Sequence, residues 1–146
     1  MSRARKAIIV ALALVGALLT AAVALALAGA RTGTYSGTTS ENQAVTFKIT
    51  SHGKVISNFS TVIGYDGKCG QGGGAPYNVK ARRIAIGAGG KFSKQVTFRF
   101  APAHISSPGR ISGTAKGSSV HGKVVQYLKG KPNRCYTETF TATRAG

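Results

Sequence analysis

The chain has 146 residues, a length that allows one ordinary domain. It carries 20 Lys and Arg against three acidic residues, for a formal net charge of +17, and six of its seven Leu lie in the first 30 residues. Residues 31–146 therefore hold a single Leu, Leu128, and a net charge of +14. Helical bundles need repeated long unbranched apolar residues along each helix, so this composition excludes one.

Acidic sites are nearly excluded as well, because Glu41, Asp66 and Glu138 are the whole acidic complement. A paired-carboxylate catalytic site could draw on these three alone. A calcium site, which needs six or more oxygen ligands, would lack carboxylates.

The N-terminal segment has the pattern of an export signal. Arg3, Arg5 and Lys6 precede an uncharged, mainly apolar run over residues 7–30. A positive region followed by an apolar core is the signature of a secretory signal peptide. The chain is therefore predicted to be exported.

A cleavage site is predicted at the end of that run. Ala28 and Ala30 flank Gly29 directly before Arg31, the small-x-small arrangement that signal peptidases accept. Cleavage after Ala30 would leave residues 31–146 as a single β-domain. An uncleaved membrane anchor stays open, because the run is longer than the roughly 20 residues that span a bilayer. Both interpretations place the domain outside the cell or at its envelope.

Cys69 and Cys135 are the only thiols in the sequence. Two lone cysteines in an exported chain are predicted to form a disulfide. The bridge would close a loop of about 66 residues, which the chain-entropy model values at about 4 kcal/mol. A nucleophilic or metal-binding thiol is the alternative, and no His lies within ten residues of either Cys to support it.

From residue 33 onward, apolar residues alternate with polar ones in short runs, as in half-buried strands. Val45, Phe47 and Ile49 alternate with Thr46, Lys48 and Thr50, for example. The pattern predicts strands over 33–38, 45–50, 54–65, 81–86, 95–100, 110–116, 120–128 and 136–143. Short Gly- and Ser-containing turns between them favour antiparallel neighbours. We therefore expect an all-β antiparallel meander of seven or eight strands, closed as a small barrel or folded as a two-layer sandwich, with exposed loops at 70–75 and 101–108.

Several short motifs recur in a known group of proteins. They are Gly-x-Tyr-x-Gly-Thr at 33–38, Val-x-Phe-x-Ile at 45–49, Gly-Lys-Phe-Ser at 90–93, Ile-Ser-Gly-Thr at 111–114, and the pair Cys69 and Cys135. In this the chain resembles small exported β-domain proteins that are common in actinobacteria. The resemblance implies an exported β-fold and supplies no activity and no catalytic residue.

The positive charge is the strongest functional signal. One cluster of cations lies before and at the start of the strand predicted over 81–86, and a second surrounds the last predicted hairpin turn. They comprise Lys80, Arg82, Arg83, Lys129, Lys131 and Arg134. A surface made for solubility alone mixes charges of both signs, whereas this one attracts polyanions. An anionic wall polymer, an anionic lipid surface or a protein partner fits this charge. Specific nucleic-acid binding is not expected of an exported chain, and a solvated surface without a ligand is the alternative.

The remaining candidates for chemistry are few. His52, His104 and His121 match no metal-ligand spacing, so no metal and no cofactor is expected. Glu138 shares the predicted inner face of its strand with Tyr136 and Phe140, so a carboxylate is expected toward the core.

These observations favour a non-enzymatic exported β-domain that binds an anionic polymer or a protein partner through basic loops. A barrel with a ligand cavity lined by Phe47, Phe98, Phe100 and Phe140 is the first alternative. A hydrolase is the second, and it would need a His within reach of a Ser and of Glu138 or Asp66.

Overall fold

A computed structural model describes residues 29–63, 76–100, 105–127 and 134–146, with the backbone alone of Phe100, Ile105, Arg134 and Cys135. Within these ranges it has eight strands and one 3-10 turn, η1 (Ala88–Gly90). The strands are β1 (Gly33–Thr39), β2 (Ala44–Thr50), β3 (Val55–Ile63), β4 (Tyr77–Ala85), β5 (Lys91–Phe100), β6 (Ile105–Lys116), β7 (Ser119–Tyr127) and β8 (Arg134–Arg144).

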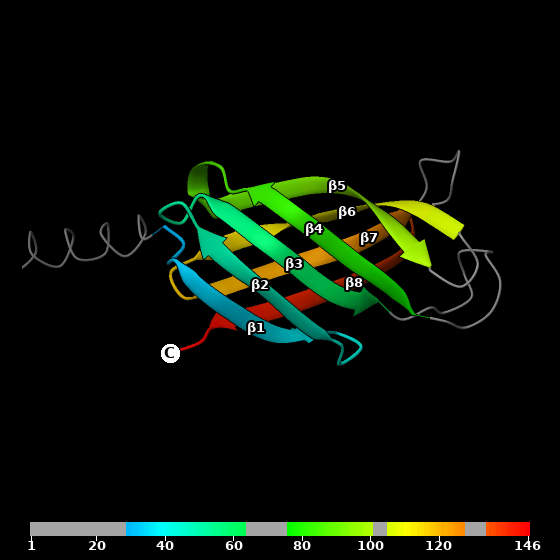
Figure 1. Cartoon of the computed structure of the whole chain (residues 1–146), viewed down its shortest axis with the longest axis horizontal. Helices are drawn as coiled ribbons and strands as arrows, with labels where there is room; N and C mark the ends of the chain where they lie inside the picture. Colours follow the sequence, from blue (N-terminus) through cyan, green and yellow to red (C-terminus); the bar gives the residue numbers. More distant parts are fainter. Residues whose placement is uncertain (1–28, 64–75, 101–104, 128–133) are drawn as a thin grey trace, which may run out of the picture.

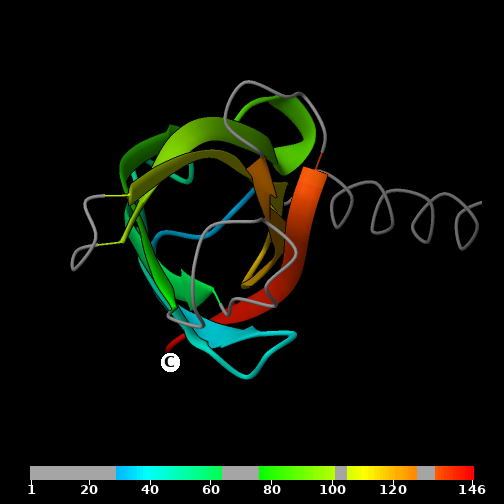
Figure 2. The ribbon, with the colours of Figure 1, turned by 90° about the vertical axis from the view of Figure 1, so that its right-hand side faces the viewer.

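Each strand pairs antiparallel with the next, and β8 pairs with β1, so the sheet closes into a barrel (Figures 1 and 2). The predicted all-β meander is confirmed, and of its two forms the chain adopts the barrel. Pairing between β4 and β5 is sparse: it joins Asn78 to Arg99, and an isolated bridge joins Ile86 to Phe92 near the connecting turn. Closure by β1 and β8 is denser, with five pairs from Tyr35–Arg144 to Thr39–Phe140.

The barrel interior follows the period-2 pattern of the sequence. In β2, Val45, Phe47 and Ile49 are buried while the residues between them are exposed. In β3 the buried residues Ile56 and Phe59 are three positions apart, which strict alternation does not allow. Asn58, with φ of 54°, supplies the extra residue between the pairs Thr46–Ser60 and Lys48–Ser57. This β-bulge turns both apolar side chains inward.

Aromatic rings fill the middle of the barrel. Tyr35 stacks on Phe47 with ring centroids 5.3 Å apart, and Phe47 stacks on Phe59 at 5.8 Å. The ring of Phe140 then meets Phe59 at 5.4 Å in a tilted arrangement. These four rings pack against one another instead of lining an open apolar cavity.

Two glycines of β6 make room for further rings. A Cβ at Gly109 would collide with the ring of Phe98, and one at Gly113 would collide with the ring of Phe92. Both rings belong to the neighbouring strand β5. Glycine on the inner wall of the barrel therefore leaves space that the ring of an aromatic residue on the adjacent strand fills.

Several predicted boundaries were wrong, and β5 for example begins at Lys91 and not at residue 95. The loop predicted over 101–108 ends earlier, because β6 already begins at Ile105. Pro108 pairs with Thr97 of β5, whereas pairing between β6 and β7 begins only at Gly109. The missing amide of Pro108 therefore costs no hydrogen bond to β7. Strand β4 begins at Tyr77 and not at residue 81. The predicted loop at 70–75 lies outside the described residues.

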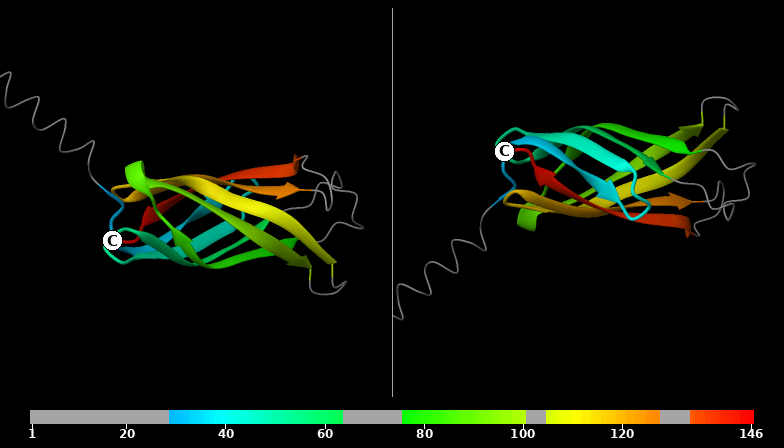
Figure 3. Two further views of the ribbon diagram at one scale, coloured as in Figure 1. Left: turned by 90° about the horizontal axis from the view of Figure 1, so that it is seen from above. Right: turned by 90° about the horizontal axis from the view of Figure 1, so that it is seen from below.

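The two ends of the barrel differ. The chain enters at Gly29 beside the C-terminus, at the end that also carries the turns 51–54, 86–90 and 117–118 (Figures 1 and 3). The opposite end carries the turn 40–43 and the ends of the strands that flank residues 64–75, 101–104 and 128–133. Among the described residues, no helix has the length and apolar character needed to cross a bilayer.

Candidate functional site: a basic patch on the barrel wall

Every Lys and Arg side chain that the structure describes is exposed. Thirteen are described: Arg31, Lys48, Lys54, Lys80, Arg82, Arg83, Lys91, Lys94, Arg99, Arg110, Lys116, Lys123 and Arg144. Of the two described acids, Glu41 is exposed in the turn between β1 and β2, and Glu138 is buried inside the barrel with 1% exposure. The charged groups on the outer surface of the described barrel are therefore almost all cations.

Five of these cations form what we call the wall patch: Lys48, Lys80, Arg82, Arg83 and Arg99. Cross-strand pairing brings them together. Ser57 of β3 pairs with Lys48 on one side and with Arg83 on the other, so these two cations end the same row across three strands. Arg99 of β5 pairs with Asn78, two residues before Lys80. Because neighbouring strands lie about 4.8 Å apart, the patch spans roughly 15 Å from β2 to β5.

The local chain path concentrates charge on β4. Inward residues alternate from Tyr77 through Val79 to Ala81, but the next one is Ile84. Two consecutive arginines, Arg82 and Arg83, are thereby both left exposed. In β3, opposite these arginines, two inward residues are likewise three positions apart, at the bulge of Asn58. The register between β3 and β4 is therefore unbroken at the bulge.

A shallow hollow lies at this bulge. Its volume is about 270 Å³, and it is lined by Asn58, Phe59, Ser60, Lys80, Ala81 and Arg82. Lys80 is the cross-strand partner of Ser60, and Arg82 lies beside Asn58 in the same register. Ammonium, guanidinium, amide and hydroxyl groups can all donate hydrogen bonds to an anionic oxygen. The hollow thus has the donors that a phosphate or carboxylate group needs.

The wall formed by β8 and β1 has a different character. Every exposed residue from Thr137 to Thr143 is Thr, and every exposed residue from Thr34 to Thr38 is Thr or Ser. This stretch of the wall carries no cation, whereas exposed cations lie on β2 and on β4 to β7. A surface with many cations and almost no acids attracts polyanions.

Of the predicted polyanion-binding residues, the structure describes the first cluster. Lys80, Arg82 and Arg83 lie within β4 on the barrel wall, not in a loop before the strand. Lys129, Lys131 and the side chain of Arg134 lie outside the described residues. Sequence reasoning missed Lys48 and Arg99, which are 32 and 19 positions from Lys80, because their proximity depends on strand register.

The predicted disulfide cannot be placed, because Cys69 and the side chain of Cys135 lie outside the described residues. The same holds for Ala28 of the predicted cleavage site. The other two residues of that site are described: Ala30 is 8% exposed and belongs to the core, and Arg31 is exposed.

The histidines do not assemble a described catalytic triad. His121 is the third residue of β7, with Nε2 3.0 Å from the Ser119 hydroxyl and Nδ1 3.3 Å from the Thr141 hydroxyl. Glu138 is inside the barrel, where the hydroxyl of Tyr136 donates to its Oε1 at 3.3 Å. His52 is exposed in the turn 51–54, and His104 and Asp66 lie outside the described residues. In the described ranges no three His, Cys, Asp or Glu residues group closely enough to hold a metal ion.

Glu138 meets the prediction that its side chain faces the core. Two positions along the same face, Gln126 of β7 is 1% exposed, and neither Oε1 nor Nε2 of its amide has a hydrogen-bond partner among the described residues. Gln126 pairs across the sheet with Tyr136 and Gly109. One side of the barrel interior is therefore polar, in contrast to the stacked rings elsewhere.

The chain was compared with protein-family models, with curated proteins and with solved structures, and none of them matches it. The functional interpretation therefore rests on the charges and geometry described above.

Proposed function

We propose that the protein is a non-enzymatic exported β-barrel that holds an anionic polymer of the cell envelope on its wall patch. The observation that carries this proposal is the asymmetry of charge. Exposed cations lie on β2 and on β4 to β7, five of them in the wall patch, while the stretches 34–38 of β1 and 137–143 of β8 expose only uncharged Thr and Ser. Repeated anionic groups on one chain can contact several of these cations at once.

Geometry supports a polymer more than a single small anion. The hollow at Asn58 offers donors for one anionic group, and Lys48, Arg83 and Arg99 surround it at distances set by strand spacing. Contacts of this kind are long-range and weak individually, and binding is expected to fall steeply as salt rises. A flexible polyanion also needs no deep cavity, which agrees with the packed rings of the barrel interior.

The test is binding of the full chain, in detergent micelles, to inorganic polyphosphate, with neutral dextran as the reference polymer. Retention on polyphosphate should be strong at about 50 mM salt, absent on dextran and lost near about 0.5 M salt. The triple variant Lys80→Ser, Arg82→Ser, Arg83→Ser should weaken binding about tenfold and flatten the salt dependence.

A matched control removes three cations outside the wall patch: Lys91→Ser, Arg110→Ser and Lys123→Ser. All six side chains are exposed, so both triple variants should fold, and they have the same net charge. The control should lose less than about threefold in affinity. Equal losses of affinity in the two variants would show that binding depends on the overall positive charge and not on the wall patch. Absence of salt-sensitive binding in the unmodified chain would refute the proposed function.

A further inference from the structure

A second cationic surface lies at the end of the barrel where the chain enters. We call it the end face and define it by residues 29–31 and the turns 51–54, 86–90 and 117–118. These segments lie together at one end in both views of Figure 3. The end face is separate from the wall patch, and its role is independent of polymer binding there.

Residues 29–31 are built into the barrel. The amide of Arg31 donates to the carbonyl of Gly117 at 2.8 Å, and the amide of Gly117 donates to the carbonyl of Gly29 at 3.2 Å. The hydroxyl of Tyr35 also donates to the carbonyl of Arg31 at 2.7 Å. These hydrogen bonds fix the position of residues 29–31. The apolar run that precedes Gly29 in the sequence is therefore joined to the barrel at this face.

Cations surround that point. Arg31, Lys54, Lys116 and Arg144 are exposed at or beside the end face, and His52 adds a titratable group. None of the residues in 29–34, 51–54, 86–91, 115–119 or 144–146 is acidic. The end face therefore combines positive charge with the exit of an apolar segment.

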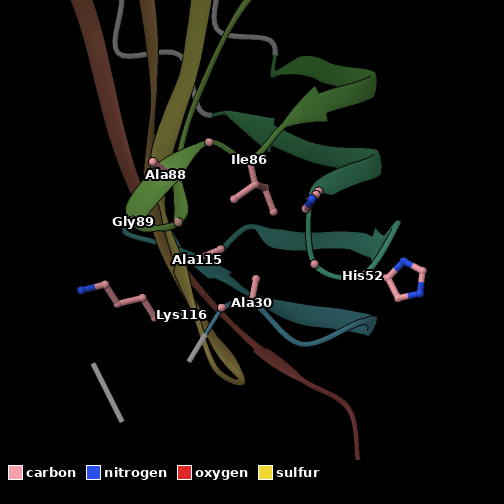
Figure 4. A pocket seen from close by; sticks show the side chains of 12 residues that line it. Ala30, His52, Ile86, Ala88, Gly89, Ala115 and Lys116 are labelled. Carbon is pink, nitrogen blue, oxygen red and sulfur yellow. The ribbon is translucent and has the colours of Figure 1, made fainter. Parts of the chain in front are cut away.

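Between the turns the end face is hollowed, with a volume of about 560 Å³. Figure 4 shows Ile86 and Ala30 pointing into this hollow from opposite sides, while His52 and Lys116 point away from it on either flank. The cations that flank the hollow are placed to meet a surface of anionic headgroups.

We infer that the end face rests on an anionic bilayer, with Lys54 and Lys116 reaching lipid phosphates and with the apolar run that precedes Gly29 anchored in the same bilayer. Two observations select a bilayer as the occupant. The apolar run outside the described residues, long enough to span a membrane, joins the barrel at this face. The charge of the face complements anionic headgroups, whose attraction acts within a Debye length of about 10 Å at 0.1 M salt.

The experiment places the full chain in lipid nanodiscs and measures backbone hydrogen exchange by mass spectrometry. One set of discs contains phosphatidylcholine alone, and the other contains about one third phosphatidylglycerol. Exchange in the turns 51–54 and 86–90 should slow about tenfold in the anionic discs and recover in about 1 M salt. The turn 40–43 at the opposite end is the internal reference and should exchange equally in both discs.

Two double variants of equal charge locate the contact. Lys54→Ser with Lys116→Ser should abolish the protection, whereas Arg110→Ser with Lys123→Ser on the barrel wall should keep it. Thermal unfolding checks that each variant is folded. The inference would be overturned by equal exchange in the two kinds of disc or by protection of the turn 40–43 instead. Equal loss of protection in both double variants would also overturn it. The triple variant of the wall patch should retain the protection, so failure here and failure of polymer binding are distinguishable.

Discussion

The ring of Phe140 on β8 lies directly over the Cα of Gly122, its cross-strand partner on β7. A Cβ at Gly122 would collide with two atoms of that ring and with the carbonyl oxygen of Ser112 on β6. Because Phe140 also packs against Phe59, the ring has no room to move aside. The inner wall of the barrel therefore depends on the absence of a side chain at this position.

Gly122→Ala should lower the free energy of unfolding by about 2 kcal/mol, the usual cost of overpacking a tight core. Urea unfolding followed by circular dichroism measures the change. The control is Gly87→Ala, where the new methyl group would meet its nearest neighbour, the Lys91 carbonyl oxygen, at 3.6 Å. Equal stability of Gly122→Ala and the parent chain would show that the ring can shift.

Tyr35 gives the barrel a pH dependence at the alkaline end. Burial raises the pKa of its phenol above the ordinary value of 10.0, and the guanidinium of Arg144 works against that rise. The folded chain therefore keeps a proton that the unfolded chain loses first. The contribution of the neutral Tyr35 phenol to the free energy of unfolding is fully present below about pH 10 and declines as pH rises toward the folded pKa.

A Tyr35→Phe variant tests this sign. It loses the hydrogen bonds to the carbonyls of Arg31 and Gly117, so it should be less stable by about 1 kcal/mol at about pH 8. The difference in melting temperature between the two chains should shrink as pH rises above about 10, because only the parent chain has an ionisable group at position 35. A difference that stays constant over that range would contradict the raised pKa.

The sequence predicted the strands better than the site. Alternation over 45–50 and 136–143 placed the inner residues correctly, because each strand is half-buried and period-2 is a local property. Closure into a barrel depends on pairing between Thr39 and Phe140, 101 positions apart, which no local pattern encodes. The wall patch has the same origin: Lys48 and Arg83 meet through Ser57, and only strand register sets that contact.

The bulge was missed for a related reason. Ile56 and Phe59 have the spacing of a helix rather than a strand, and Asn58 between them carries no decisive signal. Its φ of 54° is a conformation that Asn tolerates better than most residues other than Gly. In hindsight, Asn between two inward apolar residues was the available clue.

Asn58 lets conformation be separated from chemistry at the hollow. Asn58→Gly should keep the bulge and leave stability within about 0.5 kcal/mol, whereas Asn58→Val should lose about 2 kcal/mol, because a β-branched residue is strained at this φ. Urea unfolding gives both values. If Asn58→Gly weakens polyphosphate binding while stability holds, the amide contacts the polymer. A stable Asn58→Val variant would contradict the positive φ.

Gln126 offers the sharpest test of the barrel interior. Gln126 is 1% exposed, and neither polar atom of its amide is hydrogen-bonded within the part of the chain that the structure describes. A buried unsatisfied group costs about 1–3 kcal/mol. Gln126→Met keeps the length of the side chain and removes both polar atoms, so the free energy of unfolding should rise by about 1 kcal/mol. The control, Gln95→Met, changes an exposed residue of β5 and should stay within about 0.5 kcal/mol. A loss of stability in Gln126→Met would contradict an unsatisfied amide and would mean that it has a hydrogen-bond partner in solution, such as a bound water.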